Sequence, residues 1–305
     1  MLLFIEQCLN GVQFGLLLFL LAAGLTLVFG IMDLVNLAHG SLYMLGAYFA
    51  ATFAALTGSF VAAALLALLA TLVVGMVLEV IAIRRLYGRD HLDHVLGTFG
   101  LILFFNELVR LIWGPGGRNL PVPAWLSTSV EIFPGVYYPT YRFAIISVAL
   151  IVALLLYIVV MRTKIGMLVR AGASNREMIG ALGINIKLLY TFVFGVGAAL
   201  AGLAGVMQAP ITTASIGMGE NILIVAFVVI IIGGIGSIRG AFIASLFVGM
   251  VDTVGRAFLP DLLKLFLTPT AASTAGPALS SMLIYLLMAI VLVVRPEGLF
   301  PAATR

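Results

Sequence analysis

Residues 60–83 read FVAAALLALLATLVVGMVLEVIAI, and Glu79 is the only charged residue among them. The run ends at Arg84 and Arg85. An α-helix rises about 1.5 Å per residue and the hydrocarbon core of a membrane is roughly 30 Å thick, so about 20 apolar residues can cross it. The stretch therefore predicts a membrane-spanning helix that ends on the side of the two arginines.

Apolar runs of this kind make up most of the chain. Of its 305 residues, 63% are hydrophobic and 9% are charged, whereas about a quarter of the residues in a soluble domain are charged. The runs are continuous rather than alternating, which argues against a β-barrel. The sequence predicts an all-α polytopic membrane protein, a single transmembrane domain over residues 1–305 with about eight to ten transmembrane helices. The expected spans are residues 12–32, 41–56, 60–83, 95–113, 142–161, 190–208, 221–235, 241–259 and 278–294.

The second and seventh of these runs are short, so either could be a broken or re-entrant helix. With nine spans, one side of the bundle carries most of the basic residues, and basic residues mark the cytoplasmic side. We therefore expect a cytoplasmic loop at 162–188, a loop at 114–141 on the opposite side, a second polar loop at 260–277 and a cytoplasmic C-terminus. The net charge of +4 indicates orientation rather than nucleic-acid binding. The basic residues in question are Arg84, Arg85, Arg89, Arg162, Lys164, Arg170, Arg176, Lys187, Arg239, Arg295 and Arg305.

The loop after the fifth span contains a recognisable helix start and stop. Ser174 and Glu177 have the spacing of a capping box, in which the serine caps the helix and the glutamate reaches back. Gly183 stands where a helix end favours a left-handed residue. The pattern predicts a helix of about two turns at residues 175–182, with Met178, Ile179 and Leu182 as its apolar face. Alone such a helix is marginal, so it either docks onto a separate protein or lies at the lipid headgroups.

Polar residues also interrupt the chain after the first span, where residues 33–40 read DLVNLAHG. Asp33, Asn36 and His39 stand beside apolar helices, and Gly40 relaxes the backbone. Polar groups at membrane depth are costly and usually functional, as in an interrupted helix that lines a pathway. The alternative is a cytoplasmic turn that caps the second span, with Asn36 or His39 supplying side-chain hydrogen bonds.

A third motif, GGIGSIRGA at residues 233–241, is rich in glycine. Gly236 and Gly240 form a GxxxG pattern, which allows close helix packing. We interpret the run as a tight helical corner rather than a phosphate site, because the chain has no GxxxxGK[ST] motif and is not expected to hold ATP. The candidate residues for a translocation pathway are Asn36, His39, Gly40, Gly233, Gly234 and Gly236.

Two oppositely charged pairs lie within predicted spans. Glu107 and Arg110 are three residues apart and Asp252 and Arg256 four apart, so each pair can meet on one helix face. Structural ion pairs explain this spacing, and ion sites of a transporter are the alternative. Nothing in the sequence forms a nucleophile–base set, so we do not expect an enzyme. The sequence also predicts neither a metal site nor a cofactor in this chain.

Four motifs together resemble the LivH-type permease family of bacterial ABC importers for branched-chain amino acids. They are NLAHG at 36–40, ALGIN at 181–185, GGIGSIRGA at 233–241 and RPEGL at 295–299, and the resemblance covers residues 10–299. Where most members have a proline after GGIGSI, this chain has Arg239. In the family, the segment matching residues 170–185 is a coupling helix in a cleft of the ATPase. The resemblance thus assigns ATPase coupling to Ser174, Asn175, Arg176, Glu177, Met178, Gly180, Leu182, Gly183 and Asn185.

The resemblance also implies partners and a location. It implies a LivM-like second permease subunit, two cytoplasmic ABC ATPase subunits that bind ATP and Mg, a periplasmic substrate-binding protein, and the lipid of a bacterial inner membrane. The expected function is ATP-driven import of branched-chain or other small amino acids by alternating access. The alternative is a stand-alone secondary transporter or channel for a small polar solute such as urea or an amide, with Asp33, Glu107 or Asp252 as ion sites.

Overall fold

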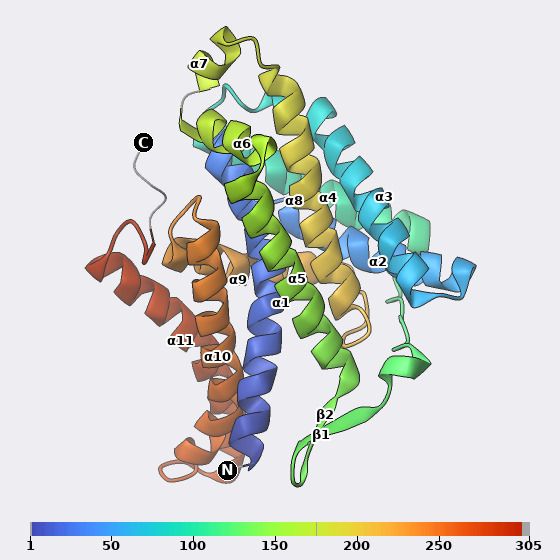
Figure 1. Ribbon diagram of the computed structural model, residues 1–305. Coiled ribbons are helices and arrows are strands. Elements are labelled where there is room, and N and C mark those ends of the chain that lie inside the picture. The colour runs from blue at the N-terminus through green and yellow to red at the C-terminus, as the bar shows by residue number, and fades with distance from the viewer. Residues whose placement is uncertain (1, 175, 301–305) are drawn as a thin grey trace.

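The structure, a computed structural model, describes residues 2–174 and 176–300, and helices make up most of this part of the chain (Figure 1). The helices are α1 Leu2–Met32, α2 His39–Thr57, α3 Phe60–Ile81, α4 His91–Trp113, α5 Thr140–Arg162, α6 Lys164–Ser174, α7 Arg176–Ala181, α8 Ile186–Gln208, α9 Met218–Gly233, α10 Ile238–Leu263 and α11 Pro269–Val294. Two short 3₁₀ helices cover Ile83–Arg85 and Ala124–Leu126, and the antiparallel strands β1 Ser129–Phe133 and β2 Val136–Pro139 form a hairpin.

Within the described residues, eight helices are long and apolar enough to cross a membrane: α1, α2, α3 with its 3₁₀ extension, α4, α5, α8, α10 and α11. Helix α9 is apolar but has only 16 residues. The prediction of an all-α polytopic membrane protein is confirmed. The two shortest helices of the bundle, α2 and α9, are those expected to be broken or re-entrant.

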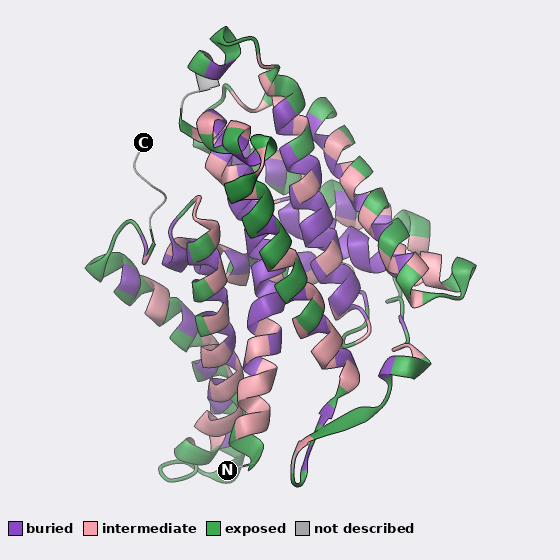
Figure 2. Cartoon of the chain, in the orientation of Figure 1, coloured by how far each residue is buried: buried purple, intermediate pink, exposed green. Residues whose placement is uncertain are grey.

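Helix α1 forms the centre of the bundle. In its most apolar 18-residue window 83% of the residues are buried, against 17% in α5 and 11% in α11. Helix α1 packs against α10, α8, α5 and α9, and Figure 2 shows buried residues along the middle of the bundle and exposed ones outside. Because lipid is as apolar as leucine, the exposed apolar side chains of α3, α4, α5 and α11 suit a lipid-facing surface.

Small residues let the central helices approach closely. A Cβ atom added at Gly24 of α1 would lie 2.6 Å from the carbonyl oxygen of Gly197 in α8 and 2.9 Å from Nε2 of His39. A Cβ atom at Gly46 of α2 would meet the backbone of Gly202 in α8, and one at Gly202 would meet Thr71 of α3. Van der Waals packing of small residues is a main source of helix association in lipid, so these contacts hold α1, α2 and α8 together.

The two ends of the bundle differ. At one end, which we call the basic end, α6 and α7 lie together with the ends of α3 and α5. The β1–β2 hairpin and the start of α1 lie at the other end, which we call the hairpin end (Figure 1). Arg84 bonds Thr191 near the start of α8, and Arg239 stacks over the ring of Tyr157 in α5. Arg84 and Arg239, two of the basic residues that the sequence grouped, thus each contact a neighbouring helix.

The predicted polar loop at 260–277 is wrong. Helix α10 runs on through Pro260, and α11 already begins at Pro269. Thr268 caps α11 with its side chain, and Pro269 fits the first helical turn because no N–H partner is needed there. The hydroxyls of Ser273 and Thr274 donate to the carbonyl oxygen of Thr270, so the polar residues are satisfied within the helix.

Replacing Gly24 by leucine should destabilise the bundle, because the added side chain meets backbone that cannot move aside. We expect the free energy of unfolding to fall by about 1–3 kcal/mol or more, measured as a lower thermal unfolding midpoint of the purified protein in detergent. Gly100→Leu on α4 is the control, because a Cβ there meets no heavy atom within 4 Å. Equal midpoints for the two variants would contradict the close packing of α1 on α8.

Candidate functional site

The segment between α1 and α2 turns back into the bundle. Nε2 of His39, the first residue of α2, lies 3.2 Å from the carbonyl oxygen of Leu21. Leu21 lies 11 residues before the end of α1 at Met32, which is about 16 Å along the helix. Residues 33–38 therefore return from the basic end toward the middle of the bundle, and α2 begins there.

Residues 33–38 leave helical geometry at a place where neighbours replace the lost hydrogen bonds. Asp33 has a φ of +52°, a left-handed conformation that aspartate tolerates better than most residues and that reverses the chain. The Leu37 N–H donates to Oγ1 of Thr98 on α4 at 3.2 Å. Irregular backbone at membrane depth is tolerated only where protein or water supplies such partners, so α4 helps to hold the segment in place.

Asn36 and His39 are both fully buried, with 0% exposure. Within the described part of the chain, the side-chain amide of Asn36 and Nδ1 of His39 have no hydrogen-bond partner. An unpaired buried polar group costs about 1–3 kcal/mol. The depth of His39 favours the interrupted helix over the surface turn, and a role of Asn36, His39 and Gly40 in a pathway stays a prediction.

A second interrupted helix starts beside the first. Residues 209–217 come from the hairpin end, where Ala214 and Arg118 exchange backbone hydrogen bonds of 2.9 and 3.0 Å. Helix α9 then begins at Met218, and the backbone of Gly219 touches that of Gly40. A side chain on either glycine would push the two helices apart. The predicted span at 221–235 thus becomes a short helix that starts inside the bundle.

The glycine-rich run lies at the other end of α9, away from Asn36 and His39. Gly234 and Gly236 have φ values of +100° and +81°, so the run forms the expected corner. The N–H groups of Leu299 and Phe300 donate to the last carbonyls of α9, at 2.8 and 3.0 Å. The predicted GxxxG packing is wrong in one respect: Gly240 packs on Gly233, while Gly236 precedes α10.

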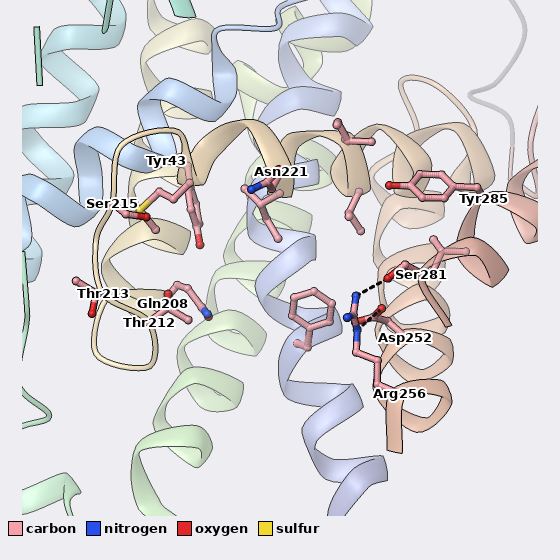
Figure 3. A pocket seen from close by; sticks show the side chains of 16 residues that line it. Tyr43, Gln208, Thr212, Thr213, Ser215, Asn221, Asp252, Arg256, Ser281 and Tyr285 are labelled. Atoms are coloured by element: carbon pink, nitrogen blue, oxygen red, sulfur yellow. Dashed lines mark hydrogen bonds and ion pairs between the residues drawn. The ribbon is translucent and has the colours of Figure 1, made fainter. Parts of the chain in front are cut away.

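A cavity of about 480 Å³ lies on the hairpin side of α9 (Figure 3). It lies between α1, α2, α9, α10, α11 and the segment after α8, and none of the predicted pathway residues lines it. One side carries the Asp252–Arg256 pair with Ser281, and the other carries Gln208, Thr212 and Thr213 (Figure 3). Sequence reasoning found the charged pair but not the cavity, because its lining comes from six separate segments. Its other lining residues are Phe14, Tyr43, Ser215, Met218, Asn221, Ile222, Ile224, Val225, Ile284 and Tyr285.

Both predicted ion pairs form, in different surroundings. The Glu107–Arg110 pair, at 2.8 Å, lies on an exposed face of α4, with 67% and 53% of the two side chains accessible. The Asp252–Arg256 pair, also at 2.8 Å, faces the cavity, and the Asp252 side chain is only 10% exposed. The Glu107–Arg110 pair fits a structural ion pair. The Asp252–Arg256 pair remains a candidate for a role in transport.

Glu79 sits at the centre of a buried polar network near the basic end. Its carboxylate lies 2.8 Å from Nη2 of Arg84 and accepts 2.7 Å hydrogen bonds from the hydroxyls of Tyr87 and Thr191. Burial and the neighbouring carboxylate raise the pKa of Tyr87, so its hydroxyl stays protonated and donates. The network joins α3 to α8 just beyond the α6–α7 segment.

The predicted coupling loop contains two helices rather than one. Helix α6 buries Gly166, Val169 and Gly172 on one face and packs against α5, α1 and α8. Ser174 ends α6 and is exposed. Asn175 and the side chains of Arg176 and Glu177 lie outside the described part of the chain, so the capping box stays a prediction.

Helix α7 ends as the sequence predicts. Gly183 has a φ of +85°, and the Ile184 N–H donates to the Ile179 carbonyl at 3.3 Å. Of the predicted apolar face, Ile179 is 5% exposed and packs within the chain, while Met178 and Leu182 are 63% and 74% exposed. Docking of this face onto a partner stays a prediction.

Gly180 is exposed, and Asn185 has a structural role that the sequence did not reveal. Its side chain accepts a 3.2 Å hydrogen bond from the Leu188 N–H and caps α8. The exposed apolar side chains of this segment are therefore those of Met178 and Leu182.

Two interrupted helices that meet inside an apolar bundle, beside a polar cavity, are typical of membrane transport proteins. The family model described as "Branched-chain amino acid transport system / permease component" matches residues 7–292. The chain belongs to this family of transport permeases.

Relatives cover most of the chain. The high-affinity branched-chain amino acid transport system permease protein BraD of Pseudomonas aeruginosa is 30% identical over 275 residues, which is 86% of this chain and 89% of BraD. The LivH permease protein of Escherichia coli K12 is 30% identical over 273 residues, 84% of this chain and 87% of LivH. A probable LivH of Methanocaldococcus jannaschii is 27% identical over 261 residues, covering 82% and 80%. No solved structure gives a significant match.

Replacing Glu79 by alanine should destabilise the protein, because Arg84, Tyr87 and Thr191 lose a shared buried acceptor. We expect a loss of about 2–4 kcal/mol, seen as a lower thermal unfolding midpoint. Glu107→Ala is the matched control and should change stability by less than about 1 kcal/mol, because its ion pair is exposed. A larger loss in the control than in Glu79→Ala would show that the network does not hold α3 to α8.

Proposed function

We propose that this chain is a transmembrane permease subunit of an ATP-driven ABC importer for branched-chain or other small amino acids, in a bacterial inner membrane. The observation that carries the proposal is the α6–α7 segment, which projects from the basic end with Met178 and Leu182 exposed. A helix of six residues next to exposed apolar side chains has little stability of its own. A cleft in a partner protein would bury them.

The energy source must lie in that partner. The sequence has no phosphate-binding GxxxxGK[ST] motif, so ATP and Mg bind to two separate cytoplasmic ATPase subunits. Closure of these subunits around ATP would move α7, which docks onto them, and α6, which is joined to α7. A Cβ atom added at Gly172 of α6 would lie 3.8 Å from Ile31 near the end of α1 and 3.6 Å from Leu189 of α8, so α6 passes close to both helices. Movement of α6 would therefore displace the end of α1, where residues 33–38 begin.

The two ends of the bundle suit different partners. The basic end faces the cytoplasm by the distribution of arginine and lysine, so the C-terminus lies inside. The hairpin end then faces the periplasm, where exposed Trp125, Val130 and Tyr137 offer a surface to a substrate-binding protein. A LivM-like second permease subunit completes the transmembrane part. Alternating access would open the bundle to each side in turn.

The test is uptake by the reconstituted complex. The chain is co-expressed with its second permease, both ATPases and the binding protein, and uptake of L-leucine into vesicles is measured with ATP. Mutation of the catalytic glutamate of the ATPase should abolish uptake. Uptake that survives this mutation would overturn the proposal in favour of a carrier that works without ATP.

Replacing Leu182 by aspartate should uncouple the ATPase, because a charge would enter the apolar contact. We expect a fall in uptake of about tenfold or more with normal membrane insertion, and the same direction of change for Gly183→Val, since valine does not tolerate a φ of +85°. Leu265→Asp is the matched control, because Leu265 is equally exposed, at 74%, but lies between α10 and α11 at the hairpin end. Normal assembly and transport by Leu182→Asp would refute the role of α7.

A further inference from the structure

We propose that the cavity beneath α9 binds the head group of a zwitterionic amino acid, with Arg256 contacting the carboxylate and Asp252 the ammonium group. The inference rests on the proposed function, because it supplies the solute site for that transport. It gives the Asp252–Arg256 pair of α10, which the sequence indicated only as an ion pair or an ion site, a role in binding the solute.

The charged pair is held in place but keeps bonding capacity. Nε of Arg256 donates to Oδ1 of Asp252 at 2.8 Å, and its Nη2 donates to Oγ of Ser281 at 2.8 Å. The hydroxyl of Ser280 donates to the Asp252 backbone carbonyl at 3.0 Å. Among the described residues, Nη1 of Arg256 and Oδ2 of Asp252 have no partner. One donor and one acceptor of opposite charge are thus fixed side by side and open to a ligand.

The surroundings of the pair differ from those of an exposed surface ion pair. Asp252 is one turn beyond Gly249, which packs on Gly15 of α1, and the Asp252 side chain is only 10% exposed. The Arg256 side chain is 49% exposed and lines the cavity. The charged atoms of the pair are therefore accessible from the cavity, where water or a solute can contact them.

The rest of the cavity matches a small amphiphilic solute. Across from the charged pair lie the polar side chains of Gln208, Thr212 and Thr213 (Figure 3). The side chains of Ile222 and Ile284 supply apolar surface. Ligand sites commonly have volumes of about 300–1,000 Å³ and combine apolar walls with a few polar groups. The 480 Å³ cavity has this composition, which suits an aliphatic side chain with a charged head group.

The first test separates solute contact from structural support. In the complete reconstituted complex, Arg256→Gln and Asp252→Asn should each lower maximal L-leucine uptake by at least about tenfold. ATP hydrolysis stimulated by the binding protein should stay within about twofold of the unaltered complex, because the ATPase contact lies at the opposite end of the bundle. Arg256→Lys should recover part of the uptake, since it keeps the positive charge. A purely structural role predicts instead that uptake and hydrolysis fall together.

Arg110→Gln is the matched control, because Arg110 also forms a 2.8 Å ion pair within a helix but does not line the cavity. If Arg256→Gln and Asp252→Asn import leucine as well as Arg110→Gln, the site assignment is overturned while the proposed function stands. If the unaltered complex imports no amino acid, the proposed function itself fails.

A second measurement decides the question if the charge variants do not assemble. A single cysteine replaces Thr212 in a Cys8→Ser background, and its alkylation is timed in the assembled complex. L-leucine should slow the labelling by at least about threefold, and L-leucinamide, which lacks the carboxylate, should slow it much less. A cysteine at Ser127, outside the cavity, should label at the same rate with and without leucine. Labelling at Thr212→Cys that leucine does not slow would overturn the proposal.

Discussion

The architecture depends on one constraint: backbone polar groups inside an apolar bundle must find partners within the protein. Regular helices satisfy this constraint with their own backbone hydrogen bonds. Residues 33–38 and 209–217 are not helical, so other segments supply hydrogen-bond partners for their backbone groups. Thr98 does this for Leu37, and Arg118 does it for Ala214. Around the central α1, this arrangement allows α2 and α9 to begin inside the bundle instead of at its surface.

Close backbone contact makes that arrangement specific. In lipid, burial of apolar surface no longer drives helices together, and packing of small residues takes its place. Gly40 and Gly219 bring the two interrupted helices into contact, and Gly24 and Gly197 hold α1 against α8. The same glycines leave little room for side chains beside His39. The polar groups of Asn36 and His39 therefore lie in a tightly packed region, while the open space lies on the other side of α9.

The position of α6 links the surface of the protein to this interior. Helix α6 packs on α5, α1 and α8, and Gly172 lies close to Ile31, the residue before the end of α1 at Met32. The Glu79 network ties α3 to α8 close to the same place. A force applied at the basic end thus reaches the start of the interrupted segment through direct contacts. The cavity lies farther along, toward the hairpin end.

The sequence alone determined the fold class, the approximate spans and the end of α7 at Gly183, because the length of an apolar run and the position of a glycine after a helix are local properties. It also identified the family through short motifs. Only the tertiary structure decided that His39 lies at the depth of Leu21, that Ile179 is buried while Met178 is exposed, and that Asp252 and Arg256 face a cavity. The physical reason is that lipid-facing and buried residues are equally apolar. Hydropathy therefore cannot tell which face of a helix turns inward, or which distant segments meet there.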